Sequence, residues 1–188
     1  MKTVNISKKD FKKIKKITDT LISIGEKYNV NFFQPGAMKE IYTSKILNHI
    51  WISDKNNVDA CDETAEKFYE YLSCKEGGLA QMDHLFKDTP TTHEKYKKSM
   101  ERITRNDKFY ITITNNNVSK PTDILRIYEV STDLIFEETN RQLNKSKNVI
   151  SHVGFDETFA INNGKLIWEK PKTKHNKFLN VVKKILNI

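Results

Sequence analysis

Segment 58–61 reads Val-Asp-Ala-Cys, and segment 67–72 reads Lys-Phe-Tyr-Glu-Tyr-Leu. Both are short apolar runs, and the acidic stretch between them predicts the turn of a β-hairpin. Each run carries one acid, Asp59 in the first and Glu70 in the second. A carboxylate among aromatic neighbours persists only if it is hydrogen bonded, protonated or bound to a cation. Two such acids that converge predict a divalent metal site.

A helix that precedes this hairpin adds a third acid. The apolar residues of segment 37–49 recur at helical spacing and predict a buried helix face. Glu40 lies seven residues before Leu47, so it nearly eclipses Leu47 on the helix and points to the margin of the apolar face. Such an acid is commonly a surface residue whose carboxylate reaches solvent. The alternative interpretation gives Glu40 a supporting role in a site beneath the helix.

The remaining segments alternate between helical and strand patterns. Strands are expected at 57–61, 67–74, 108–114, 124–130, 158–161 and 165–168, with Asn162-Asn163-Gly164 as a hairpin turn between the last two. Helices are expected at 37–49, after the capping signal at 91–94, and at 133–145, whereas 81–90 is expected to be a loop or a short helix. We predict one α/β (α+β) domain over residues 1–188, with a helical N-terminal segment 7–28 and a C-terminal helix 176–188.

Composition and charge narrow the class of protein. The chain has a formal net charge of +8 and a sequence pI near 9.3, which favours a polyanionic partner such as nucleic acid. The alternative is that abundant lysine reflects codon composition and solvation. With 37% hydrophobic and 30% charged residues, the sequence is typical of neither a membrane protein nor a disordered one. We find no secretory signal in it and expect a cytoplasmic protein without a disulfide between Cys61 and Cys74.

Other site chemistries have less support in the sequence. The spacing of His84, His93 and His152 is not that of zinc ligands, and no glycine-rich phosphate loop precedes a helix with Lys-Ser or Lys-Thr. Neither cysteine has a local partner that would activate it as a nucleophile. A cluster of carboxylates that binds a metal is therefore the leading hypothesis.

The residues Gly36-Ala37-Met38-Lys39-Glu40, then Asp59, then Glu70 resemble the core of the PD-(D/E)XK nuclease superfamily, especially type II restriction endonucleases. The resemblance covers roughly residues 36–76. It implies a mixed central sheet flanked by helices, with Asp59 and Glu70 as Mg²⁺ ligands and Glu40 as the supporting helix acid. It further implies double-stranded DNA as substrate and a homodimer as the assembly.

One position departs from the family pattern. The family has a lysine two residues after the strand acid, and Leu72 stands there, which neither donates a hydrogen bond nor stabilises negative charge. We choose Lys75 as its replacement, although strand alternation puts Lys75 on the opposite face from Glu70 unless a bulge near residues 73–74, or the end of the strand, turns it inward. Lys39 and Lys45 on the preceding helix are alternatives.

The sequence therefore predicts a Mg²⁺-dependent DNA endonuclease with Asp59, Glu70, Glu40 and Lys75 in its site. One alternative is a catalytically inactive nuclease fold that binds nucleic acid or a protein partner, with Leu72 as its main support. Ion pairing of the acids with nearby lysines, or a basic DNA-binding protein of a different fold, would account for the same features. Residues available for base contacts are Gln81, Asp83, His84, Arg105, Asn106 and 115–117.

Overall fold

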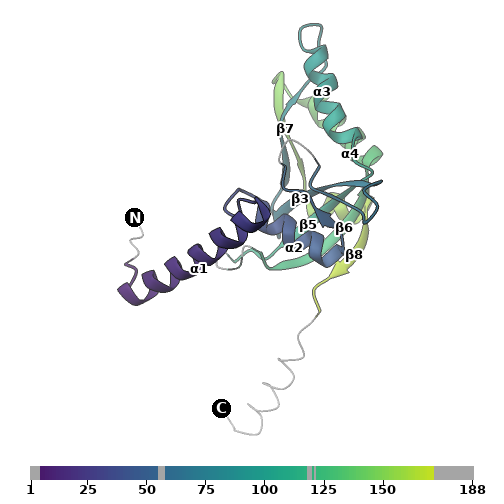
Figure 1. Ribbon diagram of the computed structural model, residues 1–188. Helices are drawn as coiled ribbons and strands as arrows, with labels where there is room; N and C mark the ends of the chain where they lie inside the picture. Colours follow the sequence, from purple (N-terminus) through teal and green to yellow (C-terminus); the bar gives the residue numbers. More distant parts are fainter. Residues whose placement is uncertain (1–4, 55–57, 118–119, 121, 172–188) are drawn as a thin grey trace, which may run out of the picture.

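A six-stranded mixed β-sheet forms the centre of the protein (Figure 1). The structure is a computed structural model that describes residues 5–54, 58–117, 120 and 122–171. The helices are α1 (Lys8–Tyr28), α2 (Ala37–Leu47), α3 (His93–Thr104), α4 (Thr132–Lys145) and α5 (Glu157–Asn163). The strands are β1 (Ile50–Trp51), β2 (Ala60–Cys61), β3 (Phe68–Lys75), β4 (Ala80–Phe86), β5 (Lys108–Thr114), β6 (Ile124–Ser131), β7 (Ile150–Phe155) and β8 (Lys165–Glu169). The mixed α/β class predicted from the sequence is confirmed.

The order of strands in the central sheet is β1-β2-β3-β5-β6-β8. Strands β3 and β5 are parallel, and every other neighbouring pair is antiparallel. The parallel step is made possible by the crossover through β4 and α3, because parallel strands cannot be joined by a tight turn. The remaining strands, β4 and β7, pair with each other as a separate two-stranded ribbon.

Two apolar clusters hold helices to opposite faces of the sheet. On one face, Ile46 and Leu47 of α2 pack against Tyr69 and Tyr71 of β3. On the other face, the larger cluster joins the central strands to the ribbon and to α3, α4 and α5. Every residue of β5 after Lys108 is buried, as expected for a strand covered on both faces. Cys61 and Cys74 are both free and buried.

Side-chain caps mark the starts of α1, α4 and α5. The Ser7 hydroxyl accepts a hydrogen bond from the Asp10 N–H at the start of α1, and the Asp156 carboxylate accepts one from the Phe159 N–H at the start of α5. The predicted helix over 7–28 is therefore confirmed as α1, and the helix predicted at 133–145 is confirmed as α4. The predicted C-terminal helix 176–188 lies outside the described residues.

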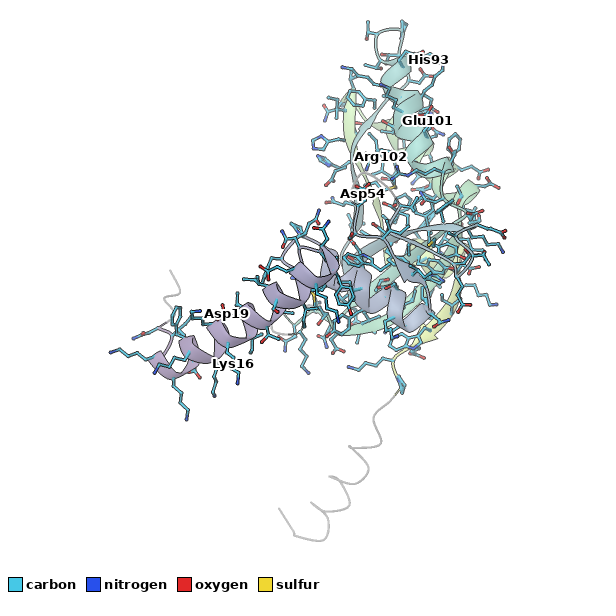
Figure 2. The ribbon with its side chains drawn as sticks, in the orientation of Figure 1. Lys16, Asp19, Asp54, His93, Glu101 and Arg102 are labelled. Atoms are coloured by element: carbon cyan, nitrogen blue, oxygen red, sulfur yellow. The ribbon has the colours of Figure 1, made fainter. Side chains whose placement is uncertain are left out.

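Helix α1 stands away from the sheet and leaves its apolar residues uncovered (Figures 1 and 2). Phe11 is 61% exposed and Ile17 is 62% exposed, although both recur at the helical spacing that usually marks a buried face. Only Gly25 is buried along the whole helix. None of the helices among the described residues is long and apolar enough to span a membrane.

The hairpin predicted around Asn162-Asn163-Gly164 is wrong. Residues 157–163 form α5 and only the second predicted strand exists, as β8, which pairs with β6. The Asp156 cap starts a helix, and Gly164 ends it with its N–H donating to the Ala160 carbonyl at 2.9 Å. A Cβ on Gly164 would lie 2.8 Å from the Glu129 carbonyl oxygen, so glycine is needed here for close packing.

Candidate active site

Asp59 and Glu70 are cross-strand neighbours. Strands β2 and β3 pair with Ala60 opposite Tyr69, and extending this antiparallel register by one residue places Asp59 opposite Glu70. The Tyr71 N–H donates to Asp59 Oδ2 at 2.8 Å, so the Asp59 carboxylate lies against the backbone beside Glu70. Directly opposite residues in an antiparallel pair have Cβ atoms about 4.5–5.5 Å apart and share a face. The predicted hairpin therefore brings the two acids together.

Helix α2 supplies the third acid to the same cleft. Glu40 lies in the first turn of α2, and its Oε2 accepts a hydrogen bond from Trp51 Nε1 at 3.2 Å. This bond holds the Glu40 carboxylate towards β1 and the hairpin, and Glu40 lines the cleft. The cleft measures about 470 Å³ and is lined by Glu40, Asp59, Glu70, Tyr71, Leu72, Gln81, Met82, Asp83, Arg102 and Arg105.

The carboxylate of Glu70 is strongly perturbed. Burial, and after it the neighbouring charge of Asp59, raises the pKa of Glu70 to about 8, while Arg105 and Arg102 oppose this shift. Among the described residues, no group donates a hydrogen bond to Glu70 Oε2, although this oxygen is buried. A buried carboxylate oxygen without a donor destabilises the ionised form, and a cation beside it would remove that penalty.

A two-carboxylate site fits Mg²⁺ better than it fits most metals. The described part of the chain holds no group of three or more His, Cys, Asp or Glu side chains arranged around one point. Mg²⁺ does not need such a cage, because it keeps several waters and is usually bound through one or two carboxylates and the substrate phosphate. Asp59 and Glu70 match that demand, and Glu70 Oε2, which accepts no hydrogen bond from the described part of the chain, is available as a ligand.

Lys75 does not lie in this cleft. Strands β3 and β5 pair without a register shift from Tyr69 opposite Lys108 to Lys75 opposite Thr114. Strand alternation is therefore unbroken, and Lys75 lies on the opposite face of β3 from Glu70. No bulge interrupts β3, which is fully described and keeps its register through its last residue, Lys75. Leu72 lines the cleft at the position where the family has lysine.

Two arginines of α3 provide positive charge at the cleft instead. Arg102 and Arg105 both line the cleft, and Arg102 Nη1 donates to the Asp83 carbonyl oxygen at 3.2 Å. Figure 2 shows α3 running from His93 at its outer end towards the sheet, with Arg102 near its inner end. Sequence reasoning has Arg105 among the residues available for base contacts and gives Arg102 no role. The signal it missed is their spacing of three residues, which puts both on one side of a helix end.

Comparison with known proteins identifies no family for this chain. No protein-family model matches the chain, and no curated protein matches it either. The resemblance to restriction endonucleases therefore rests on Glu40, Asp59 and Glu70.

Proposed function

We propose that this protein is a Mg²⁺-dependent DNA endonuclease, of the type II restriction kind, that hydrolyses phosphodiester bonds. The observation that carries the proposal is the cross-strand pair of Asp59 and Glu70, whose buried Glu70 oxygen has no donor among the described residues. A fold that only needed stability would gain nothing from a buried carboxylate oxygen that, among the described residues, has no donor. Perturbed acids in a cleft are typical of functional sites.

Each residue of the cleft has a separate role in this proposal. Asp59 and Glu70 would hold Mg²⁺, which supplies Lewis-acid polarisation of the phosphate and a bound water of lowered pKa. Glu40 fixes the edge of the site through its bond to Trp51. Arg102 and Arg105 bind the non-bridging oxygens of the phosphate, since guanidinium groups pair with phosphate in fixed geometry.

The reaction is a balanced hydrolysis. Water oxygen forms a new bond to phosphorus, and the bond from phosphorus to one deoxyribose oxygen breaks. One hydrogen of the water ends on the leaving oxygen, which becomes a hydroxyl, and the other stays with the new terminal phosphate or passes to solvent. The arginines stabilise the negative charge that gathers on the phosphate oxygens during this exchange.

Double-stranded DNA is the substrate class that best suits the charge of the chain. The formal net charge of +8 favours a polyanion, because neutralised phosphates release their condensed counterions. The restriction-enzyme resemblance adds a homodimer, which would match a palindromic target by its own twofold symmetry, and an encounter with DNA in the cytoplasm. Sedimentation of the pure protein tests the dimer.

Metal-dependent cleavage is the decisive experiment. The purified protein is incubated with unmethylated DNA of high sequence complexity in Mg²⁺ or in EDTA, beside the Asp59→Asn and Asp59→Ala variants. Asparagine keeps an acceptor for the Tyr71 N–H and removes the charge, so Asp59→Asn separates loss of metal binding from loss of folding. We expect defined fragments from the wild type in Mg²⁺ only, and none from either variant.

Glu66→Ala is the matched control, because Glu66 is an exposed acid of the same hairpin that does not line the cleft. It should cut like the wild type. Equal cutting by wild type and Asp59→Asn would reject the site.

A second candidate has its own observation. Leu72 is 5% exposed and fills the place of the family lysine with an apolar side chain. This favours a catalytically inactive nuclease fold that binds nucleic acid or a protein partner. Retention of DNA by the wild type in a mobility-shift assay, with no cutting in Mg²⁺ or Mn²⁺, would select this alternative.

A further inference from the structure

The ribbon of β4 and β7 has one covered face and one open face. Met82 and Leu85 of β4 and Val153 and Phe155 of β7 are buried in the apolar cluster that includes residues of α3 and α4. The open face carries the exposed side chains of Gln81, Asp83, His84, Ile150 and His152. A two-stranded sheet rarely holds its shape alone, and here the helices support it from behind. The open face is therefore a rigid surface that presents polar groups.

A β-bulge brings three of these side chains, those of Asp83, His84 and His152, close together. Met82 pairs with Val153 and Leu85 pairs with Ser151, so Asp83 and His84 together stand opposite His152. His84 has φ of +57°, a left-handed conformation that a side chain seldom adopts. The His152 Nδ1 lies 2.7 Å from Asp83 Oδ1, and the rings of His84 and His152 lie 5.8 Å apart. Bulges of this kind re-aim side chains and occur next to active sites.

The open face is continuous with the proposed active site. Gln81 and Asp83 line the cleft that holds Glu70 and Asp59. Arg102 reaches from α3 to the Asp83 carbonyl, so the bulge is tied to a residue that also lines the cleft. Nucleic acid bound with a phosphate at the two acids would therefore pass directly over the ribbon.

We infer that the open face of the β4–β7 ribbon enters the major groove of duplex DNA and reads the base pairs beside the cleaved bond. This inference rests on the proposed function. The major groove is about 12 Å wide and admits a two-stranded ribbon. Six residues of β7 span about 20 Å at roughly 3.3 Å per residue, which is enough to follow the groove past several base pairs.

The chemistry of the open face matches base edges. A glutamine amide such as that of Gln81 pairs with the N6 and N7 positions of adenine, and a carboxylate such as that of Asp83 accepts from the amino group of cytosine. His152 holds one Asp83 oxygen, which fixes the carboxylate and leaves its second oxygen for a base. The ring nitrogens of His84 and His152 add donors and acceptors, and exposed Ile150 offers contact to a thymine methyl group.

The test uses a library of random-sequence duplex DNA. Wild-type protein and the variants His84→Gly, His152→Ala and Gln81→Ala are incubated with the library in Mg²⁺, and the cut ends are sequenced. His84→Gly is the sharpest change, because glycine adopts the positive φ of the bulge without strain and removes only the ring. We expect the wild type to cut at a defined sequence. Each variant should lose about 5- to 150-fold of the discrimination at one base pair, the range for a lost base contact.

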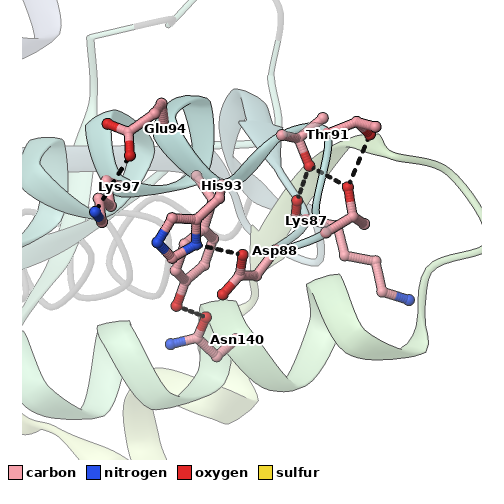
Figure 3. Close-up of polar contacts among 10 residues, drawn as sticks. Lys87, Asp88, Thr91, His93, Glu94, Lys97 and Asn140 are labelled. Atoms are coloured by element: carbon pink, nitrogen blue, oxygen red, sulfur yellow. Dashed lines mark hydrogen bonds and ion pairs between the residues drawn. The ribbon is translucent and has the colours of Figure 1, made fainter.

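His93→Ala is the matched control. His93 pairs with Asp88 at 2.8 Å (Figure 3), as His152 pairs with Asp83. It lies at the outer end of α3, whereas Arg102 of the cleft lies near the inner end (Figure 2). Its sequence preference should equal that of the wild type. Thermal melting of every variant shows that the fold is intact. If the wild type cuts at a defined sequence and the ribbon variants keep that preference unchanged, the inference is overturned. The proposed function stands in that case, because the protein still cuts DNA.

A binding arm separates the two conclusions further. The same library is selected for retention on the protein in EDTA, where metal-dependent cutting cannot occur. A sequence preference in the retained pool that His84→Gly and His152→Ala weaken supports base reading by the ribbon, even if no cutting is seen in Mg²⁺ and the proposed function fails. A retained pool without sequence preference overturns the inference.

Discussion

The two faces of β3 carry opposite kinds of polar group. On the cleft face, Glu70 has a raised pKa and a buried oxygen without a donor among the described residues. On the opposite face, Tyr71 donates or accepts a 2.8 Å hydrogen bond with His49 Nδ1, and the His49 ring stacks on Tyr69 at 4.3 Å. One strand thus holds an unsatisfied acid and a satisfied aromatic cluster within two residues of each other.

Under the proposed function, this difference separates groups that bind a ligand from groups that stabilise the fold. Buried polar groups in native proteins are nearly always hydrogen bonded, as Tyr71 and His49 are. An exception such as Glu70 calls for a ligand, and the cleft around it is where a ligand would bind. Changes on the cleft face should therefore alter cleavage, whereas changes on the aromatic face should alter only the free energy of unfolding.

The largest difference between the two faces should appear when a positively charged side chain is removed from each. Arg105 lies on the cleft side and Lys75 lies on the other face of β3, so Arg105→Ala should lower the cleavage rate about 10³-fold, near the upper range for losing one stabilising donor. Lys75→Ala should stay within about twofold of the wild type, since an exposed charge outside the site contributes little. Single-turnover cleavage of a DNA fragment measures both rates.

Arg105→Lys refines this result. Lysine keeps the charge but not the planar pair of donors, so its rate should fall between those of the wild type and Arg105→Ala. If Lys75→Ala were the slower enzyme, the assignment of the two faces would be wrong.

The sequence predicted that the two acids lie together, but it did not predict which basic side chains lie beside them. Asp59 and Glu70 come together because a hairpin with a short acidic turn leaves few registers, and strand alternation then fixes which side chains share a face. The choice of Lys75 required a bulge in β3, and pairing with the parallel strand β5 keeps that strand regular. Arg102 and Arg105 reach the cleft through the packing of α3 on the ribbon, a long-range contact that local spacing does not encode.

The ribbon itself was the largest part of the fold that the sequence did not predict. Strand β4 lies within a segment expected to be a loop or short helix, because its bulge interrupts the alternation of buried and exposed residues at Asp83 and His84. Its partner β7 is distant in sequence and has glycine at Gly154. The helix α5 was missed because Asn-Asn-Gly predicts a turn equally well at the end of a helix and between two strands.

A smaller effect should appear in the stability of the metal-free protein. The pKa of Glu70 rises from 4.5 to about 8 on folding, so the folded state binds more protons between these values. The free energy of unfolding should therefore fall as pH rises from about 4.5 to 8. Glu70→Gln removes this dependence. Its free energy of unfolding, relative to that of the wild type, should therefore increase by on the order of 2–3 kcal/mol as pH rises from 5 to 8.

Urea denaturation in EDTA at pH 5 and pH 8 measures this gain. Glu66→Gln, an exposed change in the same hairpin, serves as the control and should follow the wild type at both pH values. Parallel pH profiles for the wild type and Glu70→Gln would show that the Glu70 carboxylate is not the group responsible.

The smallest effect belongs to the aromatic face. Tyr71→Phe removes the hydroxyl that bonds to His49 and leaves the ring packing in place, so it should cost about 1 kcal/mol of unfolding free energy, the usual net value of one hydrogen bond. Tyr69→Phe is the matched control, because the Tyr69 ring stacks on His49 and its hydroxyl has no bond among the described residues. Its stability should change by less than about half as much. Both variants should cut DNA at the wild-type rate, because strand alternation directs both hydroxyls to the face of β3 opposite Glu70, and the Tyr71 N–H that binds Asp59 is unchanged. A loss of cleavage in Tyr71→Phe without a loss of stability would show that the aromatic cluster positions Glu70. The assignment of cleavage to one face of β3 and of stability to the other would then be wrong.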